Sequence, residues 1–94
     1  MKVIGQSMQN PYGQPSIPEG AIVIVDPDKE AESGNIVVAQ NRQDSEATIK
    51  KMDRDGDRIY LKPLNPNPIY EHQKMDETGR VIGVVRGMYQ EFND

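Results

Sequence analysis

The 94-residue sequence contains no cysteine and no tryptophan, and its single histidine is His72. The lack of cysteine excludes disulfides, thiol catalysis and cysteine-ligated zinc sites. One histidine cannot build a multi-histidine metal site, and the polar neighbours of His72 favour a solvated surface position. The acidic run 53–57 departs from a calcium-binding loop, because Leu64 stands at the twelfth position, where a glutamate is required. We therefore expect neither a metal nor a cofactor.

Concentrated positive charge and long apolar runs are also missing. The chain has 11 Lys and Arg residues against 15 Asp and Glu residues, a net charge of −4. The absence of a basic patch argues against direct binding to nucleic acid by this chain. No apolar run approaches the roughly 20 residues of a membrane span, and the N-terminus lacks the apolar core of a signal peptide. These features predict one cytoplasmic domain, residues 1–94, with no membrane contact.

Short runs of β-branched residues, separated by proline and glycine, dominate the chain. Such runs predict strands, and no helical periodicity extends beyond two turns. The segment 28–33 has room for one helical turn, Asp55-Gly56 fits a hairpin turn, and 65–68 reads as a rigid turn. The fold class we expect is all-β, a compact barrel-like or sandwich domain. The predicted strands are residues 2–4, 21–26, 35–40, 45–52, 58–62 and 80–86.

Ser7 and Lys50 are the candidates for catalysis. Ser7 follows Gly5 at the end of the first predicted strand, where backbone can approach a substrate closely. A lysine drawn into an apolar site loses hydration, so its pKa falls and its neutral amine can act as a base. A Ser-Lys pair is a known variant of the serine-histidine-aspartate arrangement. Taken singly, each residue has a simpler interpretation: a serine that satisfies turn amides, and an edge-strand lysine that blocks aggregation.

Seven stretches, taken together, resemble the C-terminal domain of LexA-like self-cleaving repressors, and most closely that of lambdoid phage repressors. They follow one another along nearly the whole chain. The stretches are 3–8 (VIGQSM), 16–20 (SIPEG), 22–27 (IVIVDP), 34–39 (GNIVVA), 46–51 (EATIKK), 61–66 (LKPLNP) and 81–85 (VIGVV).

The resemblance implies a curved-sheet domain of the LexA and signal-peptidase type, with Ser7 as nucleophile and Lys50 as general base for autoproteolysis. It also implies a homodimer or higher oligomer, a RecA filament as co-protease in the SOS response, and DNA binding through an N-terminal domain outside this chain. The scissile bond of the family, usually Ala-Gly or Cys-Gly, is not present before Ser7. Two alternatives remain: a UmuD-like polymerase-accessory domain, and a structural dimerisation domain whose dyad is idle.

Three structural expectations follow. The Ser7 hydroxyl and the Lys50 amine should lie within hydrogen-bond reach, about 2.6–3.5 Å. Strand alternation places Lys50 and Lys51 on opposite faces, so we expect only Lys50 to reach Ser7. The surface for self-association should include residues 80–92, whose tail carries Met88, Tyr89 and Phe92, because methionine and aromatic residues are enriched at interfaces.

Overall fold

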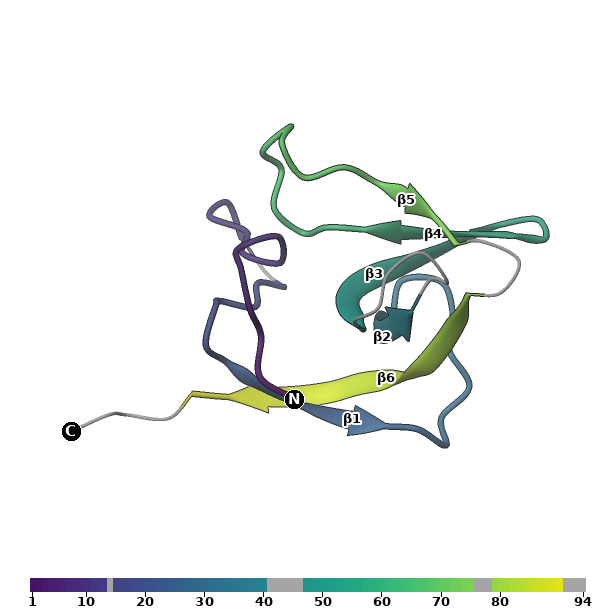
Figure 1. Ribbon diagram of the computed structural model, residues 1–94, viewed down its shortest axis with the longest axis horizontal. Coiled ribbons are helices and arrows are strands. Elements are labelled where there is room, and N and C mark those ends of the chain that lie inside the picture. The colour runs from purple at the N-terminus through teal and green to yellow at the C-terminus, as the bar shows by residue number, and fades with distance from the viewer. Residues whose placement is uncertain (14, 41–46, 76–78, 91–94) are drawn as a thin grey trace.

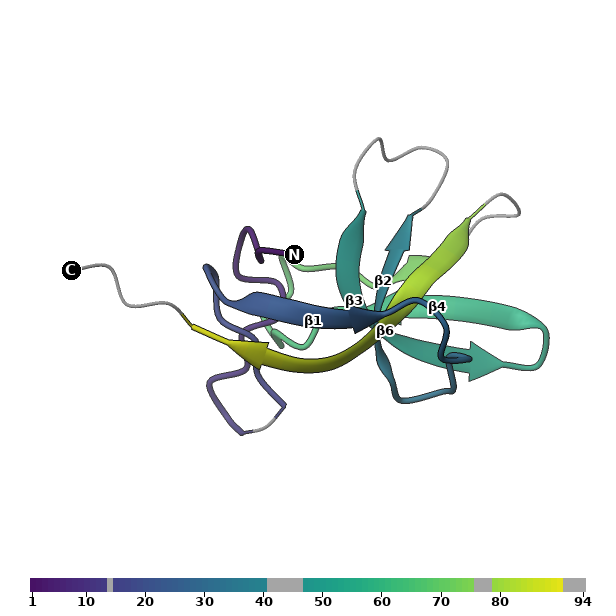
Figure 2. The ribbon, with the colours of Figure 1, turned by 90° about the horizontal axis from the view of Figure 1, so that it is seen from below.

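The computed structural model describes residues 1–13, 15–40, 47–75 and 79–90. Within these ranges the chain forms no helix, and so none that could cross a membrane. Six strands make one curved, fully antiparallel sheet in the order β1-β6-β2-β3-β4-β5 (Figures 1 and 2). Their bounds are β1 Ile22–Asp26, β2 Ile36–Gln40, β3 Thr48–Asp55, β4 Arg58–Lys62, β5 Gln73–Lys74 and β6 Arg80–Tyr89.

The all-β prediction is therefore confirmed, and the sheet stays open, because β1 and β5 are its two edges. Strands β1, β2 and β4 lie where the β-branched runs predicted them. The hairpin expected at Asp55-Gly56 joins β3 to β4, with Gly56 and Asp57 as its loop residues. Gly56 has a φ of +64°, a conformation that a two-residue hairpin turn requires and that glycine adopts without strain.

Two predicted elements were wrong. The helical turn expected at 28–33 is absent, because side-chain acceptors draw its amides into bends: Asp26 Oδ1 accepts from the Asp28 N–H and Asn35 Oδ1 from the Glu32 N–H. The first predicted strand, residues 2–4, is reduced to an isolated bridge between Lys2 and Ile22. The start of the predicted strand at 45–46 lies outside the described residues.

Apolar clusters lie on both faces of the sheet, and β2 contributes to each of them. Val38 belongs to a cluster that includes Met8, Ile17 and Ile49. Its neighbour Val37 belongs to a second cluster with Met52, Leu61 and Val84. Successive residues of a strand point to opposite faces, so a continuous apolar strand is the pattern of one covered on both sides. Strand β2 lies between β6 and β3 in the interior of the sheet, as expected for a strand that is covered on both faces.

Asp53 on β3 has a pKa below its ordinary value, because its carboxylate accepts hydrogen bonds from Lys62 Nζ at 2.6 Å and Ser33 Oγ at 3.1 Å. Both partners favour the charged form. The unfolded chain therefore takes up this proton at a higher pH than the folded chain. The stability that Asp53 contributes is present above the unfolded pKa and is lost as the pH falls through the lowered folded pKa.

Asp53→Asn is accordingly expected to destabilise the fold at neutral pH, and its difference from wild type should shrink below about pH 4. Urea unfolding of both proteins at pH 7 and pH 3 measures this difference. Asp57→Asn, in the exposed hairpin loop, is the control. Equal destabilisation by Asp53→Asn at both pH values would contradict the explanation.

Candidate active site

Ser7 lies in a turn that is fixed at both ends, and not at the end of a strand as the sequence suggested. The Gly5 N–H donates to Glu19 Oε2 at 2.6 Å, and the Met8 carbonyl accepts from the Ile17 N–H at 2.7 Å. The Met8 side chain is fully buried in the first apolar cluster. Gly5 has a φ of +84°, which explains why glycine stands where the chain enters this turn.

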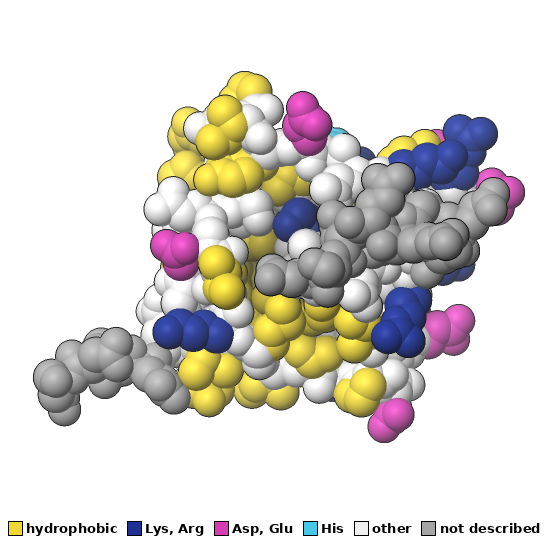
Figure 3. All heavy atoms as spheres, viewed as in Figure 1, with side chains coloured by type: hydrophobic (Ala, Val, Ile, Leu, Met, Phe, Trp, Pro, Cys, Tyr) yellow, Lys and Arg dark blue, Asp and Glu magenta, His cyan; other side chains and the backbone are white. Residues whose placement is uncertain are grey.

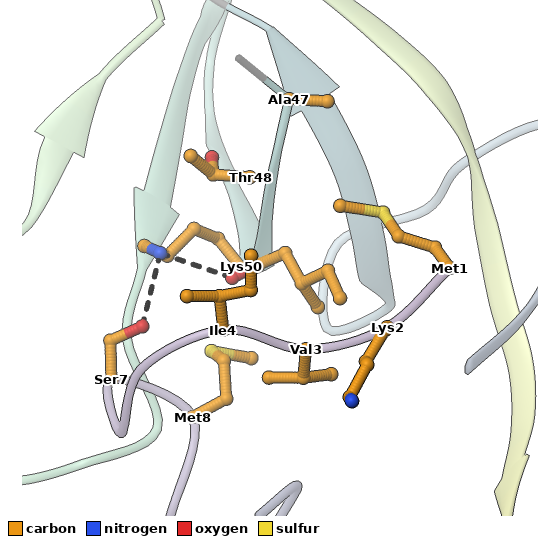
Figure 4. A pocket seen from close by; sticks show the side chains of 10 residues that line it. Met1, Lys2, Val3, Ile4, Ser7, Met8, Ala47, Thr48 and Lys50 are labelled. Carbon is orange, nitrogen blue, oxygen red and sulfur yellow. Dashed lines mark hydrogen bonds between the residues drawn. The ribbon is translucent and has the colours of Figure 1, made fainter. Parts of the chain in front are cut away.

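Lys50 reaches this turn from β3, where it pairs with Val37 of β2. Its Nζ donates to Ser7 Oγ at 3.3 Å and to the Ile49 carbonyl at 3.1 Å (Figure 4). The predicted distance between hydroxyl and amine is thus confirmed, across 43 positions of sequence. The contact comes from Lys50, while Lys51 is exposed, so the prediction that Lys50 is the lysine beside Ser7 is also confirmed.

Two hollows flank the Ser7–Lys50 pair. One is a cavity of about 180 Å³ between the segments 1–4 and 47–50, with Ser7 and Met8 at one end (Figure 4). The other, of about 310 Å³, is lined by Ser7, Lys50, Pro63 and residues 69–71. Apolar side chains also gather on the face of the molecule seen in Figure 3. Ser7 and Lys50 line both hollows.

Backbone donors stand next to the same hydroxyl. In the part of the chain that the structure describes, the N–H groups of Ser7 and Met8 donate to no acceptor. Unpaired N–H groups beside a nucleophile can stabilise the oxyanion that forms when a carbonyl is attacked. The arrangement therefore combines a hydroxyl, an amine and two backbone donors, the groups that acyl transfer requires.

The single histidine of the chain does not join this site. His72 is exposed and lines neither of the two hollows. Among the described residues, no three His, Cys, Asp or Glu side chains lie in an arrangement that could hold a metal ion.

Asn65 is a site residue that sequence reasoning missed, because it was interpreted only as part of a turn. Its backbone N–H donates to the Ser7 carbonyl at 2.9 Å, and its Nδ2 donates to the Gln6 carbonyl, also at 2.9 Å. The only sequence signal was the stretch Leu64-Asn65-Pro66, which formed part of the resemblance.

A match to a known protein family shows where this chain belongs. The family profile described as Peptidase S24-like matches residues 1–86. The chain belongs to the peptidase S24-like family. Ser7, Lys50 and both hollows lie within the matched residues.

The relatives of this S24-like chain include a transcriptional regulator for a conjugative element, a phage repressor and a bacterial LexA repressor. The HTH-type transcriptional regulator for conjugative element R391, from Providencia rettgeri, is 45% identical over 92 residues, covering 98% of this chain and 42% of the relative. Repressor protein C2 of Salmonella phage P22 is 45% identical over 85 residues (90% and 38%). A LexA repressor from Citrifermentans bemidjiense is 38% identical over 95 residues (94% and 43%). The chain spans less than half the length of each, and the LexA-like resemblance is confirmed.

Proposed function

We propose that this domain is the self-cleavage and dimerisation domain of a phage-type transcriptional repressor, with Ser7 as nucleophile and Lys50 as general base. The observation that carries the proposal is the 3.3 Å contact between Lys50 Nζ and Ser7 Oγ at the meeting point of two hollows. A serine is a weak nucleophile by itself and needs an adjacent base to take its proton. Lys50 is the basic side chain that lies in position to do so.

The reaction has two steps. Neutral Lys50 accepts the Ser7 proton while Oγ attacks the scissile carbonyl, and the N–H groups of Ser7 and Met8 stabilise the resulting oxyanion. Collapse of this intermediate breaks the C–N bond, and the Lys50 ammonium returns its proton to the departing amine. Water then attacks the acyl-Ser7 ester with Lys50 again as base, which releases the carboxylate and restores the hydroxyl.

The cavity between the segments 1–4 and 47–50 is the place for the scissile segment. It ends at Ser7 and has apolar side chains from Val3, Met8 and Ile49 in its lining. A small apolar residue before the scissile bond, as in Ala-Gly, suits the apolar part of a cavity of about 180 Å³. We place the residues that follow the bond over the second hollow, beside Pro63 and Tyr70.

In its parent protein, the domain would work in the cytoplasm, where a repressor meets DNA. An N-terminal DNA-binding domain outside this chain would contact the operator, and a RecA filament formed after DNA damage would promote cleavage in the SOS response. Support comes from the relatives, which include an HTH-type transcriptional regulator, a phage repressor and LexA repressors. Cleavage would separate the operator-binding part from the part that dimerises.

Cleavage of a peptide in trans tests the activity of the chain itself. A peptide of about ten residues with a central Ala-Gly bond is incubated with the 94-residue protein at pH 7 to 10, and the products are identified by mass spectrometry. We expect hydrolysis at Ala-Gly, and none in a control peptide with d-alanine before the bond. A protein that leaves both peptides intact would favour a structural domain with an idle dyad.

We also propose that the C-terminal half of β6 forms the surface for self-association. Met88 and Tyr89 are 46% and 49% exposed, and Ile24 on the neighbouring β1 is 54% exposed. Ile24 pairs with Gly87, two residues before Tyr89, so Ile24 and Tyr89 share one face of the β1–β6 edge of the sheet, and Met88 is exposed on the other face of the same edge. A group of exposed apolar side chains is typical of an interface. Phe92, which we also predicted to belong to this surface, lies outside the described residues.

Met88→Glu combined with Tyr89→Glu is expected to weaken the dimer at least about tenfold, because two charges would have to lose their hydration on association. Sedimentation equilibrium over a wide concentration range measures this. Ile69→Glu, at an apolar position on the connection between β4 and β5 that is 74% exposed, is the control. A wild-type protein that remains monomeric, or a double variant that dimerises normally, would remove this assignment.

A further inference from the structure

The structure assigns Asn65 as a positioning residue for the turn that contains Ser7, residues 5–8, which is called the nucleophile turn below. This assignment rests on the proposed function. Asn65 lies in the connection between β4 and β5, 59 positions from Gln6. It donates twice to this turn: from its backbone N–H to the Ser7 carbonyl and from Nδ2 to the Gln6 carbonyl, each at 2.9 Å. It therefore holds the two carbonyls on either side of the Ser7 α-carbon.

These two carbonyls belong to the peptide units that supply the oxyanion donors. The Gln6 carbonyl shares a planar peptide with the Ser7 N–H, and the Ser7 carbonyl shares one with the Met8 N–H. In a trans peptide the C=O and N–H bonds point in opposite directions, so fixing the carbonyl fixes the direction of the N–H. A hydrogen bond to the carbonyl also polarises the peptide and strengthens its N–H as a donor. Asn65 thus orients both donors without touching the substrate.

The same contacts fix the position of Ser7 itself. Once both flanking peptide planes are held, the direction of its Cα–Cβ bond is restricted, which limits the positions that Oγ can take relative to Lys50 Nζ. A displacement of about 1 Å in a reacting group can cost about a hundredfold in rate. The Gln6 carbonyl accepts a second bond, from the Gln9 N–H at 3.1 Å, which closes the turn.

Asparagine is the side chain that this position requires. Asn65 Oδ1 accepts from the Asn67 N–H at 2.9 Å, while Nδ2 donates to the Gln6 carbonyl. One side chain must therefore offer an acceptor and a donor from the same planar group, which aspartate cannot do when ionised. The proline at position 66 restricts the backbone next to Asn65 further.

Asn65→Asp is the sharpest test, because it keeps the size of the side chain, the backbone N–H and the acceptor for Asn67. It replaces only the donor to Gln6, with an oxygen that repels that carbonyl. We expect kcat for cleavage of the Ala-Gly peptide to fall about tenfold to a hundredfold, with KM changed less than about twofold. Asn65→Ala should show a similar loss of kcat.

Asn67→Ala is the matched control in the same loop. Asn67 Oδ1 accepts from the Ile69 N–H, and among the described residues no hydrogen bond joins Asn67 to Gln6 or Ser7, so the variant loses a turn hydrogen bond of the same kind. Its kcat should stay within about threefold of wild type. Wild-type kcat in Asn65→Asp, or an equal loss of kcat in Asn67→Ala, would overturn the assignment.

Hydrogen exchange at the Gln9 amide provides a readout that does not depend on catalysis. Because this amide donates to the Gln6 carbonyl, it should exchange at least about tenfold faster in Asn65→Asp and unchanged in Asn67→Ala. Unchanged exchange in Asn65→Asp would refute the assignment. A wild-type chain that cleaves no peptide would refute the proposed function alone, and Gln9 exchange would then decide whether Asn65 holds the turn.

Discussion

Ser7→Ala and Lys50→Ala are each expected to lower the rate of Ala-Gly peptide cleavage by about a thousandfold or more. Ser7→Ala removes the atom that attacks the carbonyl. Lys50→Ala leaves that atom in place but removes the amine that lies 3.3 Å from it, so the hydroxyl keeps its proton. The two residues act as a unit, so the double variant should be hardly slower than either single variant.

Lys51→Ala is the matched control for Lys50→Ala. It removes an identical side chain from the adjacent position of β3, and Lys51 is exposed. Its cleavage rate should stay within about threefold of wild type, and thermal melts of all the variants would show whether each is folded. Loss of cleavage in Lys51→Ala with activity retained in Lys50→Ala would contradict the assignment of the base.

Gly83→Ala is expected to be the most destabilising methyl addition in the sheet, with a loss of about 1–3 kcal/mol. Gly83 is buried on β6, opposite Val38 of β2. A Cβ at this position would lie 2.6 Å from Val25 Cγ1 and 2.9 Å from the Asp26 carbonyl oxygen. The valine can change rotamer, but the oxygen belongs to the backbone of β1, which pairs with β6. The two strands would therefore have to move apart.

Gly87→Ala on the same strand separates this steric effect from any general effect of replacing glycine. Its added Cβ would meet only Ile24 Cδ1, at 3.9 Å, which is an ordinary contact. Both variants reduce the entropy of the unfolded chain equally. Thermal unfolding should place Gly83→Ala at least about 5 °C below wild type and Gly87→Ala close to it. Equal melting temperatures for the two variants would contradict the packing described for Gly83.

The sequence predicted the parts of the fold that depend on local pattern. The apolar run of Ile22–Asp26 and that of Ile36–Gln40 form strands as expected, because β-branched residues bounded by turn residues have few other low-energy choices. Ser7 and Lys50 were likewise found from residue type and motif. Their contact at 3.3 Å joins β3 to the turn that contains Ser7, across 43 positions of sequence.

The remainder depends on contacts between distant segments. Gln73–Lys74 forms β5 only because β4 offers a free edge, and two polar residues carry no strand pattern of their own. The contribution of Asn65 arises from a hydrogen bond across 59 positions, which no local pattern records. The helical turn predicted at 28–33 failed for the opposite reason, because side-chain oxygens compete locally for its backbone amides.

The pH dependence of covalent modification at Ser7 tests the central claim most directly. A serine-directed phosphonate is added to wild type and to Lys50→Ala, and the rate at which the Ser7 peptide gains mass is followed from pH 6 to pH 11. Only a neutral amine can accept the hydroxyl proton, so the wild-type rate should rise with pH and level off once Lys50 has lost its charge. Lys50→Ala should react slowly at every pH, without that rise. Identical profiles for the two proteins, or modification of another serine in place of Ser7, would contradict the assignment of Ser7 and Lys50 as a catalytic pair.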